Sequence, residues 1–179
     1  IKLAELNKLI RSLSLAIYSP MKYVLPSRAK EYSKKYDTNT GKSVFKQVDR
    51  EESLVHLMRI NILKRMESSI YSFAITVSKI LKNIDLTLEK LNNFEDIEED
   101  FNIEELDIDD TRLDSVLIGS KKVKVHLQDI DKIRWESELE GDKLILEKIL
   151  NEASKITTDR DKKLIELQEL IKKKVENPR

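Results

Sequence analysis

The fold is decided by residues 62–84, which read ILKRMESSIYSFAITVSKILKNI. Apolar residues recur there at steps of three and four, the periodicity of one face of an α-helix. Neither Gly nor Pro occurs from Asp49 to Asn92, and the start of this stretch, Asp49-Arg50-Glu51-Glu52, is similar to a capping box. The pattern therefore predicts one helix over residues 49–93, about 60 Å long at ~1.5 Å per residue, that serves as a strut or coiled-coil arm.

The composition of the whole chain agrees with a helical fold. Its 179 residues include three Gly, three Pro and no Cys, and 40% of them are hydrophobic. Disulfides, thiolate metal sites and cysteine nucleophiles are excluded, and frequent tight turns are disfavoured. We expect a single all-α domain over residues 1–179, an extended antiparallel helical bundle around one long central helix.

Residues 1–48 are predicted to form an N-terminal helix and a basic connector. Apolar residues from Leu3 to Ile17 follow helical spacing, and that helix ends before Pro20 because a residue preceding proline avoids the helical region. Residues 19–26 contain two prolines and indicate an extended connector. Residues 27–36 predict a short basic helix, and residues 37–41 a polar turn.

The zero net charge hides an uneven distribution. Residues 1–94 hold 17 basic against 9 acidic side chains, residues 95–115 hold 1 against 11, and residues 116–179 hold 15 against 13. The three segments therefore carry +8, −10 and +2. We expect residues 94–115 to form an acidic surface loop, with a helical turn as the most structure it would adopt.

The C-terminal segment, residues 116–179, is predicted to be mainly helical. A short β-hairpin near 116–127 and a helix are about equally supported by the alternation in that stretch. A helix capped by Asp129 or Asp131 then runs through Trp135 to Leu150, and a last helix starts near Thr158. Its apolar face carries Leu164, Leu167, Leu170 and Ile171.

Candidate catalytic and ligand-binding motifs are weak. Gly41-Lys42-Ser43 lacks the upstream glycine and buried strand of a phosphate-binding loop. His56 and His126 have no local metal-ligand partner, which favours surface or interface histidines. The carboxylate pairs Glu136/Glu140 and Glu138/Asp142 lie four residues apart, which favours a solvated helix face over a metal site. We predict no catalytic residue, no metal site and no cofactor within this chain.

The basic first half is the stronger candidate for binding. Basic and aromatic residues alternate in it: Lys22, Arg28, Lys30, Lys34 and Lys35 with Tyr18, Tyr23, Tyr32 and Tyr36. This pattern suits phosphate contacts with occasional base stacking. The alternative, which the charge balance favours, is a solvated lysine face.

Residues 53–73, SLVHLMRINILKRMESSIYSF, carry the most specific signal. They resemble the helical segment between the two RecA-like motor lobes of bacterial Swi/Snf-like superfamily-two helicases, often phospholipase-D-linked, although Met66 stands where Leu is usual. Residues 142–144 (DKL) and 161–167 (DKKLIEL) resemble the helix that precedes the second lobe of that family. The resemblance is weak over residues 1–30, and the acidic block matches no part of the family.

The resemblance implies a parent ATP-dependent DNA helicase or translocase that binds ATP and magnesium outside these residues. This chain would then be a fragment, an interlobe accessory domain with the motor lobes as partners and duplex DNA as a second partner. Arg59, Lys64, Arg65 and Glu67 would contact a lobe or the DNA backbone; an intrahelical Lys64–Glu67 pair is the alternative.

Other function classes remain open. A helical protein-interaction or coiled-coil adaptor domain, homo-oligomeric through its long helix, is the alternative to the motor accessory. No apolar run reaches the ~18 residues of a membrane span and no signal peptide opens the chain, so we expect a cytoplasmic location without membrane contact.

Overall fold

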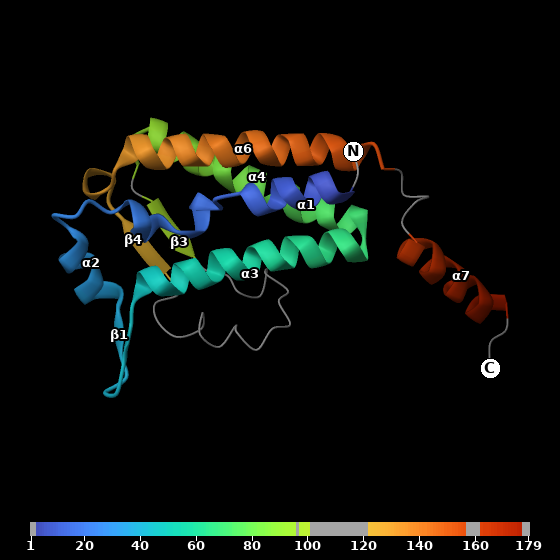
Figure 1. The fold of residues 1–179 in the computed structure, drawn as a ribbon, viewed down its shortest axis with the longest axis horizontal. Helices are drawn as coiled ribbons and strands as arrows, with labels where there is room; N and C mark the ends of the chain where they lie inside the picture. Colours follow the sequence, from blue (N-terminus) through green and yellow to red (C-terminus); the bar gives the residue numbers. More distant parts are fainter. Residues whose placement is uncertain (1–2, 96, 101–121, 157–161, 177–179) are drawn as a thin grey trace.

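The computed structural model describes residues 3–95, 97–100, 122–156 and 162–176. Six α-helices dominate them, which confirms the predicted all-α class. Four helices form an antiparallel bundle in Figure 1: α1 (Leu3–Ser12), α3 (Gln47–Ser68), α4 (Ile70–Asn92) and α6 (Lys132–Ser154). Both α1 and α4 pack against α3 and α6, so residues distant in sequence share one core.

The predicted single helix over residues 49–93 is wrong, because the chain breaks at Ser69. Ser69 has extended backbone angles (φ −160°, ψ 121°), and its side-chain oxygen accepts a hydrogen bond from the Ser72 N–H. Serine is a preferred N-cap, so α4 starts anew and runs back along α3. The predicted strut of about 60 Å is thus a helical hairpin.

The start of this hairpin also differs from the sequence-based prediction. Helix α3 begins at Gln47, whose N–H donates to Asp37 Oδ1 at 2.8 Å, and Asp49 lies inside the first turn. Glu51 points inward with 1% of its surface exposed, and its Oε2 accepts the Met21 N–H at 3.0 Å. Glu52, the glutamate of the predicted capping box, is exposed, whereas its neighbour Glu51 holds the N-terminal connector.

Helix α1 ends at Ser12, five residues before Ile17, the last residue of the apolar pattern that predicted it. Leu15 adopts a left-handed conformation (φ 51°), and two 3₁₀ turns follow, η1 (Ala16–Tyr18) and η2 (Pro20–Tyr23). Met21 and Tyr23 are buried. The segment predicted as an extended connector therefore packs into the core, because these two side chains fill space between α3 and α6.

The core lies along the shared axis of the bundle. The fully buried side chains come from all four helices and include Leu6, Ile10, Ile62, Phe73, Trp135 and Leu146. Each large apolar side chain of this kind contributes about 1.5 to 3 kcal/mol when buried. Burial of these apolar side chains in one shared core explains why α4 folds back on α3.

A small antiparallel sheet closes one end of the bundle. Strand β3 (Ile97–Asp100) pairs with β4 (Lys122–Val125), with Ile97 opposite Val125. Of the two alternatives for residues 116–127, the structure shows a strand over Lys122–Val125, but β4 pairs with the acidic block, part of which is thus a strand rather than a loop. The other half of the predicted hairpin, residues 116–119, and most of the acidic block lie outside the described residues.

The remaining elements surround this bundle. Helix α2 (Ala29–Tyr36) confirms the predicted short basic helix, and it leads into a hairpin of β1 (Thr38–Asn39) and β2 (Val44–Phe45). Helix α7 (Lys162–Glu176) lies apart from the bundle in Figure 1. None of the helices in the described part of the chain is long and apolar enough to cross a membrane.

Candidate nucleic-acid interface

Helix α2 separates its tyrosines from its lysines. Tyr32 and Tyr36, four residues apart, face inward with 4% and 6% of their surfaces exposed, whereas Lys30, Lys34 and Lys35 are exposed. Residues at this spacing share a helix face. The outer face of α2 is therefore a row of cations that the structure leaves in contact with solvent.

The tyrosine hydroxyls attach α2 to the sheet and to the turn η4 (Leu127–Asp129). Tyr36 Oη donates to the Lys124 carbonyl and accepts the Lys124 N–H, both at 2.9 Å. Tyr32 Oη donates to Asp129 Oδ2 at 2.8 Å and accepts the His126 N–H at 3.0 Å. Both rings are thus buried inside the protein, which favours the alternative of a solvated lysine face over base stacking by these two tyrosines.

Burial also changes the ionisation of this contact. The pKa of Tyr32 is raised to about 12, chiefly by desolvation and also by the hydrogen bond to the Asp129 carboxylate, while the His126 N–H acts in the opposite direction. The phenol is therefore neutral at physiological pH and keeps the proton that it donates to Asp129.

Two of the predicted cationic contacts are engaged within the chain. Arg28 Nε lies 3.0 Å from Asp129 Oδ1, and its Nη1 lies 3.1 Å from Glu31 Oε2. Lys22 Nζ lies 3.7 Å from Glu138 Oε2. About half of each cationic side chain stays exposed. Their first role is therefore to hold α2 and η2 in place.

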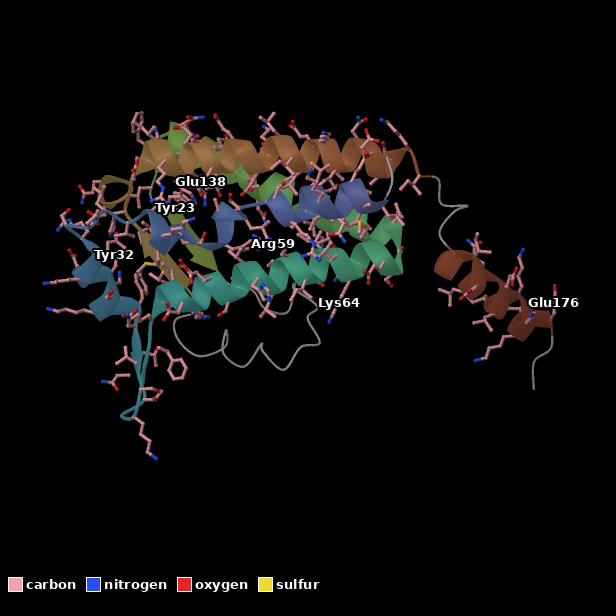
Figure 2. All side chains as sticks on the ribbon, viewed as in Figure 1. Tyr23, Tyr32, Arg59, Lys64, Glu138 and Glu176 are labelled. Atoms are coloured by element: carbon pink, nitrogen blue, oxygen red, sulfur yellow. The ribbon has the colours of Figure 1, made fainter. Side chains whose placement is uncertain are left out.

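Tyr23 belongs to the core beside α6. Its ring stacks on that of Trp135 with centroids 5.7 Å apart, and its hydroxyl donates to Glu138, which lies next to it in Figure 2. Desolvation raises the pKa of Tyr23 well above its usual range, and the Glu138 carboxylate raises it further. Tyr23, like the α2 tyrosines, offers no face to a base.

Asp142 is a buried acceptor, and its predicted position on a solvated helix face is wrong. With 2% of its surface exposed, it accepts the Ser14 N–H at 2.7 Å and the Ala16 N–H at 2.9 Å. Burial raises its pKa, while these backbone donors lower it. The carboxylate thereby stabilises the left-handed turn at Leu15, which costs about 1 to 3 kcal/mol in a non-glycine residue.

Arg59 supports the same turn from the opposite side. Its Nη2 donates to the Leu13 carbonyl at 2.7 Å, at the end of α1 where helix carbonyls lack partners. Figure 2 shows Arg59 reaching from α3 toward α1. Arg59 thus makes a structural contact inside the bundle, and its predicted contact with a motor lobe or DNA stays a prediction.

Two of the other three predicted α3 residues lie on the outer side of the bundle. Lys64 and Glu67 are exposed, and Lys64 points away from the bundle in Figure 2. Arg65 is half-buried, and its carbonyl accepts the Ser69 N–H at 2.8 Å. The structure places these three residues far along α3 from its N-terminal end, where α2 and the β1–β2 hairpin join the bundle.

No enzymatic constellation emerges among the described residues. No group of three His, Asp or Glu side chains in this part of the chain is arranged to hold a metal ion. Gly41-Lys42-Ser43 lies at the tip of the β1–β2 hairpin rather than between a buried strand and a helix. What the geometry offers is a rigidly attached cationic face.

Sequence reasoning missed the structural roles of four acidic residues. Asp129 holds α2, whereas Glu51, Glu138 and Asp142 hold residues 14–23, and all four resemble solvated carboxylates in a chain with 37% charged residues. One available signal was the four-residue spacing of Tyr32 and Tyr36, which already predicts a buried face for α2. Comparison with family models, with curated proteins and with solved structures found no match to this chain.

Proposed function

We propose that this domain is an accessory domain of an ATP-dependent DNA helicase or translocase, located between its two motor lobes, and that it binds the backbone of duplex DNA through α2. The observation that carries the DNA contact is the row of exposed cations Lys30, Lys34 and Lys35 on a helix whose tyrosines are buried. Cations fixed in such a row neutralise phosphates and release counterions.

The attachment of α2 supports a mechanical role. Tyr32, Tyr36 and Arg28 join α2 to β4 and η4, and α6 begins three residues after η4, with Asp131 as its N-cap. A force applied to α2 by bound DNA would thus reach a 23-residue helix through hydrogen bonds rather than through a loop. Coupling of this kind lets a domain transmit relative movement of its neighbours.

The motor context is supported by the resemblance of residues 53–73 and of the two C-terminal segments to the interlobe helices of that family. Under this proposal the motor lobes bind ATP and magnesium, the flanking lobes are partners within the same protein, and the protein is cytoplasmic. The helical domain contributes position and DNA contact, and no catalytic step.

Salt-dependent binding of a labelled duplex tests the DNA contact. Lys34→Ala with Lys35→Ala should weaken binding and lower the slope of log affinity against log salt by about 2. Lys79→Ala with Lys82→Ala, an equal charge change on exposed positions of α4, is the matched control and should leave the slope unchanged. Absence of duplex binding at low salt, or an equal loss in both variants, would refute the proposal.

The motor context needs its own test. In the longer protein that the proposal implies, the Lys34→Ala, Lys35→Ala change should lower DNA-stimulated ATP turnover without changing nucleotide affinity. An unchanged stimulated rate would leave α2 without a part in coupling.

A second candidate function, a helical protein-interaction domain, is favoured by α7. Its exposed apolar side chains include Leu167, Leu170, Ile171 and Val175, which are 53 to 74% exposed. A helix with such a stripe is typical of one that packs on a partner. Concentration-dependent self-association that Leu167→Glu abolishes would favour this alternative.

A further inference from the structure

The β1–β2 hairpin is a self-contained projection. Thr38 pairs with Phe45, and the turn is closed by the Thr40 N–H, which donates to the Ser43 carbonyl at 3.0 Å. Gly41 at the tip has φ 79°, and a side chain there would meet nothing within 4 Å. Figure 1 shows the hairpin extending away from the bundle. Its shape therefore comes from its own hydrogen bonds and from the Asp37–Gln47 bond at its base.

This projection displays apolar side chains that it does not bury. Val44 is 57% exposed and Phe45 is 37% exposed. Successive strand residues point to opposite faces, so the two side chains lie on opposite sides of the hairpin. A two-residue strand pair has no core of its own in which to bury them, which leaves part of the Phe45 ring accessible to solvent.

The charge around the hairpin is strongly positive. Residues 27–46 carry six basic side chains and two acidic ones. Both acids are engaged, since Glu31 pairs with Arg28 and Asp37 accepts the Gln47 N–H. Lys42 at the tip and Lys46 beside Phe45 are exposed. The partner that complements this region is a polyanion with flat groups available for stacking.

We propose that the β1–β2 hairpin binds single-stranded DNA adjoining the duplex held by α2, with Phe45 stacked on an unpaired base and Lys42 and Lys46 on the neighbouring phosphates. The inference rests on the proposed function in that its partner is DNA. Single-stranded DNA fits better than duplex, because bases inside a duplex have no free face for an aromatic ring. The hairpin follows directly from α2, so one continuous segment contacts both parts of a junction.

Equilibrium binding of the full chain to a blunt duplex and to the same duplex with a single-stranded tail tests this proposal. The wild-type chain should prefer the tailed DNA, and Phe45→Ala should lower that preference by about tenfold, within the range for one base stacked on an aromatic ring. Val44→Ala, which removes the apolar neighbour on the opposite side, is the matched control and should keep the preference. Far-ultraviolet circular dichroism checks that each variant is folded.

A second measurement reports the contact directly. Trp135 is the chain's one tryptophan and is fully buried, so Phe45→Trp places an accessible indole on the hairpin. Tailed DNA should quench the added fluorescence, and blunt duplex should not.

The outcomes separate the two proposals. Equal affinity of the wild-type chain for tailed and blunt DNA, or a preference that survives Phe45→Ala, overturns the hairpin inference. If the Lys34, Lys35 variant still weakens blunt-duplex binding in that case, the proposed function stands alone. If the wild-type chain binds neither DNA at low salt, both are overturned.

Discussion

Replacing Tyr32 with phenylalanine removes one oxygen from the contact that fixes α2. Tyr32 Oη donates to Asp129 Oδ2 at 2.8 Å and accepts the His126 N–H at 3.0 Å, and the tyrosine is 4% exposed. A hydrogen bond to a charged group contributes roughly 1.5 to 3 kcal/mol, and an unsatisfied buried donor costs about 1 to 3 kcal/mol. We expect Tyr32→Phe to lower the free energy of unfolding by about 2 to 3 kcal/mol at pH 7.

The same substitution should change how stability depends on pH. A pKa of about 12 in the folded state, against the ordinary 10.0, means that the folded protein holds the phenol proton more tightly. The stability linked to this shift is about 2.7 kcal/mol; it is fully present below pH 10 and is lost as pH rises through 12, with about 1.4 kcal/mol lost by pH 11. Tyr32→Phe lacks the titrating phenol, so the stability difference between wild type and Tyr32→Phe should be about 1.4 kcal/mol smaller at pH 11 than at pH 7.

Urea unfolding of both proteins from pH 7 to pH 11 measures this difference, and effects common to both, such as lysine deprotonation, cancel. Tyr71→Phe is the matched control, because Tyr71 is 59% exposed on α4. The eight-residue α2 is too short to persist alone, so duplex binding should weaken together with stability. A Tyr32→Phe deficit that stays constant from pH 9 to pH 11, or that equals the Tyr71→Phe deficit, would refute the reasoning.

Three further substitutions test other parts of the fold by urea unfolding. Ser69→Ala removes the N-cap of α4 and should cost about 1 kcal/mol, whereas Ser78→Ala on the exposed face of α4 should cost far less. Phe94→Gly should stabilise the protein by about 0.5 to 1 kcal/mol, because Phe94 has φ 56° and is 75% exposed; a loss of stability would contradict this. Asp142→Asn should cost about 2 kcal/mol at pH 7, since the amide turns a donor toward a backbone N–H. Burial raises the pKa of Asp142, so its contribution is fully present below pH 3.8 and falls as pH rises through the folded pKa; the Asp142→Asn deficit should therefore be larger in acid than at pH 7.

Local sequence signals predicted the elements whose ends are determined locally. The sequence indicated a helix cap at Asp129 or Asp131, of which the structure shows Asp131, and it predicted the short helix at α2 and the all-α class. The break at Ser69 was not, because a serine within a helical pattern also suits a solvent-facing position. What selects the cap is tertiary: α4 must turn back on α3 before Phe73 and Val77 are buried.

The candidate site divides in the same way. The exposed lysines of α2 follow from their spacing, and the structure leaves them on the surface. The end of α1 depends instead on Arg59, Trp135 and Asp142, whose side chains contact residues 13–16 from distant parts of the chain. No local pattern around Leu15 indicates a left-handed turn, since that turn is stabilised by groups outside its own segment.

The turn at Leu15 has a consequence for the order in which the chain matures during synthesis. Asp142 reaches back 128 residues to Ser14, and Trp135 reaches back 119 residues to Ala16. A nascent chain that ends before Trp135 already contains α1, α3 and α4, but not the acceptor and the indole that complete the turn. Contacts across such separations form late, because closing a long loop costs conformational entropy before the hydrogen bonds and packing at its ends can stabilise it. Helix α1, which is synthesised before the other helices of the bundle, is therefore among the last of them to reach its native packing.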